Sequence, residues 1–100
     1  MRLLNPARIK TQQVTVTTAG TPVQPSSYPI PEGIEFVVKA KSTNTGLVSI
    51  GGSSADALQT GSACFKLVAS QGVSMQITDP ANIWIDAAVS GEGVDIISEF

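Results

Sequence analysis

The feature that most constrains this chain is the alternation of β-branched with polar residues, in short runs separated by turn residues. Ten Val, nine Ile and nine Thr stand against five Leu and two Met. Branching at Cβ suits the pleated surface of a sheet better than a helix. Gly, Pro, Asn and Ser separate the runs at spacings of about 8–15 residues, which is typical of a sandwich or barrel.

The alternation predicts short strands and no long amphipathic helix. In residues 34–41, for example, Phe36 and Val38 would face one side and Lys39 the other. A single helical turn is expected near residues 55–58. The expected strands cover residues 13–18, 34–41, 47–50, 63–69, 73–77, 83–89 and 94–100. We therefore expect an all-β fold, an antiparallel β-sandwich of about seven short strands.

The chain has the length of one domain. Residues 1–12 show no sustained period and include Pro6, which disfavours a helix, so we expect an extended N-terminal arm. Residues 13–100 would form the β-sandwich domain, in which the proline-rich stretch 23–31 is a loop or a protected sheet edge. A sandwich of this size without a disulfide is marginal alone, so self-association or docking on a partner is the expected reinforcement.

Basic and acidic residues are divided unevenly along the chain. Residues 1–31 carry +3, from Arg2, Arg8 and Lys10, and residues 32–100 carry −5. Such asymmetry is typical of a basic tail that meets an acidic surface, the alternative being a solvated tail without a partner. Three basic residues can neutralise at most about three phosphates, whereas specific DNA binders commonly contact about six or more, so nucleic acid is not an expected partner. No apolar run approaches the roughly 18–20 residues of a membrane span, so no membrane partner is expected either.

Side chains for catalysis and metal binding are scarce. The chain has no histidine and one cysteine, Cys64, which we expect to be a small buried apolar residue. We therefore expect neither an enzyme nor a cofactor. Residues 51–54 have the glycines of a phosphate-binding loop but not its Gly-Lys-Ser/Thr ending. Asp86, Glu92 and Asp95 would converge across the last hairpin as a cation site or a catalytic carboxylate pair, or would simply form a solvated face.

Three apolar residues, Val37, Trp84 and Ile97, fall on strand faces that are expected to be polar. If they adjoin, they form a patch that a monomer seldom exposes, and another protein covering it is the simplest explanation. Trp is enriched at the centres of interfaces, although core packing or loop cover would also account for Trp84. These three residues and the three basic residues of the arm are the candidate partner contacts.

An ordered series of short marks runs from Val14 to the end of the chain. They are Val14-Thr15-Val16-Thr17, Ile30-Pro31-Glu32-Gly33, Val37-Val38-Lys39-Ala40, Asn44-Thr45-Gly46-Leu47-Val48-Ser49-Ile50-Gly51, Leu58, Gly61, Asn82-Ile83-Trp84-Ile85-Asp86 and Gly91-Glu92-Gly93-Val94-Asp95-Ile96. In this order they make the chain resemble small virion proteins of tailed bacteriophages, of the capsid decoration (cement) type.

The resemblance implies a jelly-roll-like β-sandwich without catalytic residues. It implies a decoration protein that stabilises the head shell through its β-domain and N-terminal arm, with the major capsid protein and its own copies, as a homotrimer, for partners. The location would be the outer capsid surface of the virion, after synthesis in the host cytoplasm. Alternatives are another phage module (head-fibre base, neck adaptor or tail component) and a carbohydrate-binding β-module in which Trp84 stacks on a sugar.

Overall fold

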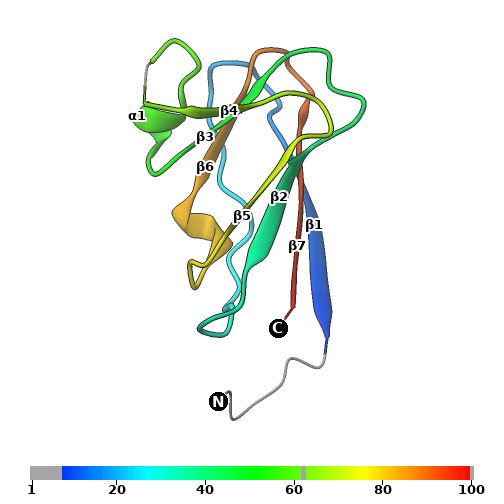
Figure 1. Cartoon of the computed structure of the whole chain (residues 1–100). Helices are drawn as coiled ribbons and strands as arrows, with labels where there is room; N and C mark the ends of the chain where they lie inside the picture. The colour runs from blue at the N-terminus through cyan, green and yellow to red at the C-terminus, as the bar shows by residue number, and fades with distance from the viewer. Residues whose placement is uncertain (1–7, 62, 100) are drawn as a thin grey trace.

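A computed structural model of the chain describes residues 8–61 and 63–99. These residues form strands joined by loops, one short helix and one 3₁₀ turn (Figure 1). The strands are β1 (Ile9–Thr15), β2 (Phe36–Ala40), β3 (Val48–Gly51), β4 (Phe65–Leu67), β5 (Gly72–Met75), β6 (Trp84–Ala87) and β7 (Gly93–Glu99). The helix α1 spans Ser54–Ala57, and the 3₁₀ turn η1 spans Pro80–Asn82. Within the described ranges, no helix has the length and hydropathy of a membrane span.

All strand pairs are antiparallel, and pairing runs from the two ends of the chain inward. β1 pairs with β7, the segment at Val23 bridges Ile85 of β6, β2 pairs with β5, and β3 pairs with β4. β7 also pairs with β2, and β6 with β3. The result is a four-stranded sheet of order β1-β7-β2-β5 and a three-stranded sheet of order β4-β3-β6. The prediction of an antiparallel β-sandwich with about seven short strands is confirmed.

The core lies between the two sheets and follows from the alternation of the strands. In β2, Phe36, Val38 and Ala40 are fully buried, whereas Val37 and Lys39 are exposed. Each large apolar side chain that is fully buried stabilises the fold by about 1.5–3 kcal/mol. The stability of the short strands therefore depends on the inward side chains, and the outward side chains are not needed for the core.

The boundary predicted for the N-terminal arm was wrong at its C-terminal end. Residues 9–12 belong to β1, which pairs with β7 from Ile9 opposite Glu99 to Thr15 opposite Gly93. The side chains of β1 are mostly polar, so their pattern gave little sign of a strand. The backbone hydrogen bonds to β7 hold this segment in the sheet whatever its side chains. Residues 1–7 of the predicted arm lie outside the described residues.

The connection between β1 and β2 shields one side of the sandwich. Val23 and Ile85 exchange two backbone hydrogen bonds of 2.8 Å, which covers the edge of β6. The Gln12 side chain accepts a hydrogen bond from the Ser26 amide and donates one to the Ser26 carbonyl, at 2.9 and 3.3 Å. The proline-rich stretch thus protects a sheet edge, which is one of the two roles predicted for it.

The helix α1 covers the outer side of the three-stranded sheet. A Cβ on Gly51 would overlap the backbone of Ala57, so only glycine permits this close approach. The Ser49 hydroxyl, fully buried, donates a 2.6 Å hydrogen bond to the carbonyl oxygen of Ala57. The helical turn predicted near residues 55–58 is therefore present, and it removes the outer side of β3 from solvent.

Candidate functional site

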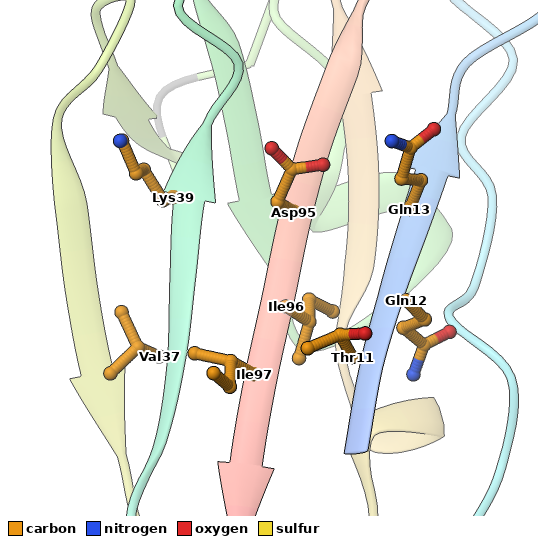
Figure 2. A pocket seen from close by; sticks show the side chains of 8 residues that line it. All are labelled: Thr11, Gln12, Gln13, Val37, Lys39, Asp95, Ile96 and Ile97. Atoms are coloured by element: carbon orange, nitrogen blue, oxygen red, sulfur yellow. The ribbon is translucent and has the colours of Figure 1, made fainter. Parts of the chain in front are cut away.

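The outer side of the four-stranded sheet is the candidate site, and we call it the open face. The strand register sets the outward side chains in rows, of which two lie at the centre, and Ile9 and Glu99 stand in the row before them. One row consists of Thr11, Ile97, Val37 and Ser74, and the next of Gln13, Asp95, Lys39 and Gly72. Figure 2 shows the side chains of both rows on β1, β7 and β2. Neighbours within a row stand on adjacent strands, about 4.8 Å apart.

The centre of the open face is apolar. Val37 and Ile97 are directly opposite each other in the β2–β7 register and are 39% and 43% exposed. A shallow groove of about 520 Å³ runs over them, with Thr11 and Gln13 along its β1 side. Val37 and Ile97 thus form a small apolar patch in solvent, on strands whose inward positions already supply the core.

Opposite charges flank the apolar centre. Lys39 is the register partner of Asp95, one row beyond Val37 and Ile97. The Asp95 carboxylate also lies 3.6 Å from Nζ of Lys41, and its side chain remains 51% exposed. The Lys41 side chain is only 18% exposed, so this ion pair is partly buried. The position of Lys39 and Asp95 beside an apolar pair matters for recognition, because complementary charges select partners and orientations.

Two of the three predicted outward apolar residues adjoin, and the third does not. Val37 and Ile97 form the centre of the open face, whereas Trp84 belongs to β6 in the other sheet. Trp84 is half-buried and has Gly51, the residue against which α1 packs, as its register partner. The condition that the three residues adjoin is therefore met by Val37 and Ile97 and not by Trp84, because the sheet to which a strand belongs depends on its pairing.

The basic residues predicted as contacts lie at the start of β1 or before it. Arg8 and Lys10 are exposed, and Arg2 lies outside the described residues. Lys10 is the register partner of Ser98, whose side chain is on the inward side of the sheet. Nζ of Lys10 lies 5.7 Å from the centroid of the Tyr28 ring. Such a cation–π contact directs the ammonium group of Lys10 away from the open face.

The three carboxylates do not converge across the last hairpin, which was one of the alternatives for them. Asp86 is buried, and its carboxylate accepts hydrogen bonds from the backbone N–H groups of Gly20, Ala87 and Gln59 at 2.9, 2.8 and 3.3 Å. Glu92 binds a loop instead, and Asp95 lies on the open face. Among the residues that the structure describes, no group of three metal-ligating side chains comes together. Asp86 was expected to be solvated, but α1 and the residues after it cover that side of β6.

Two further sequence candidates have local roles. In the glycine-containing loop 51–54, the Ser53 hydroxyl caps α1 by accepting a 3.1 Å hydrogen bond from the Asp56 amide. Cys64 is half-buried instead of fully buried, and its thiol donates a 3.7 Å hydrogen bond to the Gly61 carbonyl. Neither residue lies on the open face.

Glu92 fastens the loop before β3 to the last hairpin. Its carboxylate accepts hydrogen bonds from the Gly46 amide at 3.0 Å, the Thr45 amide at 2.7 Å and the Thr45 hydroxyl at 2.9 Å. These bonds, those of the Gly46 and Thr45 amides first, hold the pKa of Glu92 below its ordinary value. A carboxyl group with a pKa that is lower in the folded state stabilises the fold above its unfolded pKa. That contribution is lost as the pH falls through the folded pKa.

We therefore expect the urea concentration at the unfolding midpoint of the wild-type protein to decrease as the pH is lowered from about 5 to about 3. Glu92→Gln should be less stable than the wild type at neutral pH, because the hydrogens of its amide group would face the backbone N–H donors. Its urea midpoint should also change less than that of the wild type over this pH range. Glu32→Gln, at an exposed turn position, should behave like the wild type. Identical pH profiles for the wild type and Glu92→Gln would contradict this role for Glu92.

Comparison of the chain with protein-family models, with curated proteins and with solved structures finds no match in any of the three. The interpretation of the open face therefore depends on its own chemistry. The sequence pattern identified Val37 and Ile97 as outward apolar residues and placed Lys39 on the side of Val37, but it did not pair Lys39 with Asp95. Both are exposed alternating residues of strong strands, and only the register shows that they are neighbours.

Proposed function

We propose that this chain is a capsid decoration (cement) protein of a tailed bacteriophage. It would bind the shell of the major capsid protein through its β-domain and the N-terminal residues, and stabilise the shell by linking neighbouring subunits. The observation that carries the proposal is the open face, where Val37 and Ile97 adjoin in solvent. A β-domain that keeps such a surface uncovered is suited to act by contact with other proteins.

The order of strand pairing supports the proposal. If the segment at Val23 takes the place of a strand, the chain forms four nested pairs: β1 with β7, the Val23 segment with β6, β2 with β5, and β3 with β4. Nested pairing of eight successive segments over two sheets is the arrangement of a jelly roll. Jelly rolls are common in viral capsid proteins and also in lectins and cupins, so the fold favours a virion role without requiring it.

A decoration protein can act through contacts that are individually weak. A shell offers many equivalent positions, so each contact adds to the others through the high effective concentration of neighbours. A homotrimer, which the sequence resemblance implies, would match the three-fold positions of a symmetric shell.

The test is co-sedimentation of the purified protein with heads of the same phage that lack it. We expect the wild-type protein to pellet with the heads and Ile97→Asp to lose about tenfold or more in apparent affinity, because a charge would have to be desolvated at the centre of the contact. Val68→Asp is the matched control, since Val68 is exposed but lies in the turn between β4 and β5 and does not line the groove of the open face.

Removal of residues 1–7 should also weaken binding if the N-terminal residues contact the shell. Equal binding by the wild type and Ile97→Asp would overturn the role of the open face. Binding to purified tails or necks, with none to heads, would replace the decoration role with that of another virion module.

A further inference from the structure

The open face is complementary to itself. Its central residues form a square in the β2–β7 register, with Val37 opposite Ile97 and, one row along, Lys39 opposite Asp95. The apolar side of this square has an apolar residue on each strand, and the charged side has a cation on β2 and an anion on β7. From this pattern we infer that the open face binds the open face of a second copy of the chain across a two-fold axis.

The axis is fixed by the register. It runs along the strands, midway between β2 and β7, and therefore places β2 of one copy over β7 of the other. Val37 then lies over Ile97, and Lys39 lies over Asp95, twice each because the contact is symmetric. Two sheets that pack face to face lie about 10 Å apart, a separation that the Lys39 and Asp95 side chains span together.

The outer strands fit the same arrangement. The axis exchanges β1 with β5, so that Thr11 meets Ser74 and Gln13 meets Gly72. These residues are uncharged, and Gly72 leaves space for the longer Gln13 side chain. An axis at right angles to the strands that passed between the two rows would set the apolar pair against the charged pair. One that passed through the row of Val37 and Ile97 would set Asp95 against Glu99, a like charge. The axis along the strands keeps the apolar residues together and pairs Lys39 with Asp95.

Like charges oppose the contact at two symmetric positions. Ser98 of β7 is the register partner of Phe36 of β2. Because the strands are antiparallel, the next row contains Glu99 of β7 and Glu35, the residue just before β2. Both acids are exposed, and the axis brings Glu35 of one copy near Glu99 of the other. The face covers only a few hundred Å² per copy, which is the size of a weak or transient contact. We therefore expect reversible self-association that becomes substantial at protein concentrations of about 100 µM or above.

This inference rests on the proposed function insofar as that proposal makes the open face a contact surface, and it names the partner that covers this face in the free protein. On a shell the major capsid protein would take the place of the second copy, so self-association and shell binding would compete for the open face. Self-association can be measured without any shell, so the two proposals can fail separately.

The experiment is sedimentation velocity of the purified full chain at concentrations from about 5 to 500 µM. We expect the wild-type sedimentation coefficient to rise with concentration toward that of a dimer. Lys39→Glu and Asp95→Lys should each weaken association about tenfold or more, because two attractive pairs become repulsive. An equimolar mixture of the two variants should associate again, because Glu at position 39 then faces Lys at position 95 and Asp95 faces Lys39.

Two further variants and one check complete the design. Glu99→Gln should associate more tightly than the wild type, and Lys66→Glu, an exposed charge reversal on β4 in the other sheet, should not differ from it. Thermal unfolding of each variant verifies that it is folded. A wild-type protein that stays monomeric over the whole range, or a mixture of folded variants that does not recover association, would overturn the inference. So would an oligomer that is insensitive to both charge reversals.

Discussion

Gly93→Ala should be among the most destabilising single substitutions in this protein, lowering the free energy of unfolding by about 3 kcal/mol or more. Gly93 is the first residue of β7 and is buried opposite Thr15 of β1. A Cβ at this position would overlap the carbonyl oxygen of Val14. The backbone of Gly93 is also held from the other side by the Asn44 amide, which donates a 2.8 Å hydrogen bond to its carbonyl. The strand cannot move aside without breaking one of these contacts.

Urea unfolding of the wild type, Gly93→Ala and Gly52→Ala measures the effect. Gly52 is the control because a Cβ there would meet no heavy atom within 4 Å, and we expect a change within about 0.5 kcal/mol. If both alanine variants unfold at the same urea concentration, then the approach of β1 to the start of β7 is not as close as described.

Asp86→Ala should cost about 3 kcal/mol of stability, the second large effect. The buried Asp86 carboxylate ties β6 to two loops, through the backbone N–H groups of Gly20 and Gln59, and caps its neighbour Ala87. Removing it leaves these donors without their acceptor in a largely buried place, where each unsatisfied group costs about 1–3 kcal/mol. The stability of Asp86→Asn should lie between those of the wild type and Asp86→Ala, because one acceptor oxygen is kept while an amide NH₂ group replaces the other oxygen.

Asp56→Ala is the matched control, an exposed carboxylate on α1 whose loss should change stability by about 0.5 kcal/mol or less. Hydrogen exchange adds a local measurement: the amides of Gly20 and Gln59 should exchange faster in Asp86→Ala than in the wild type. If Asp86→Ala is as stable as Asp56→Ala, Asp86 is not the anchor of these loops.

Most of the fold could be predicted from the sequence where the strands alternate strongly. The alternation in β2, from Phe36 to Ala40, determines both the strand and its buried side. β1 begins earlier than predicted because its polar residues, such as Thr11 and Gln12, are held by pairing with β7, which no local pattern reveals. Asp86 illustrates the same limit, since its burial depends on the packing of α1 on the outer side of the three-stranded sheet.

The candidate site could be predicted only in part. Val37 and Ile97 were identified as apolar residues in polar positions, and they are neighbours on the open face. Trp84 is also an apolar residue at a position expected to be polar, but it belongs to the three-stranded sheet. The pairing of Lys39 with Asp95 depends on strands more than fifty residues apart in the chain. Register of this kind is set by the global packing of the sheet, so the self-complementary pattern emerges only from the structure.

The most direct measurement is the accessibility of position 37 in the assembled state. Val37→Cys, in a chain whose native thiol is removed by Cys64→Ser, can be labelled with a maleimide when free in dilute solution and when bound to heads. We predict that binding slows labelling about tenfold or more, because the centre of a contact excludes solvent, whereas Val68→Cys in the same background keeps its rate. Labelling of Val37→Cys at the same rate in the free and bound protein would contradict the assignment of the open face as the surface through which this protein acts.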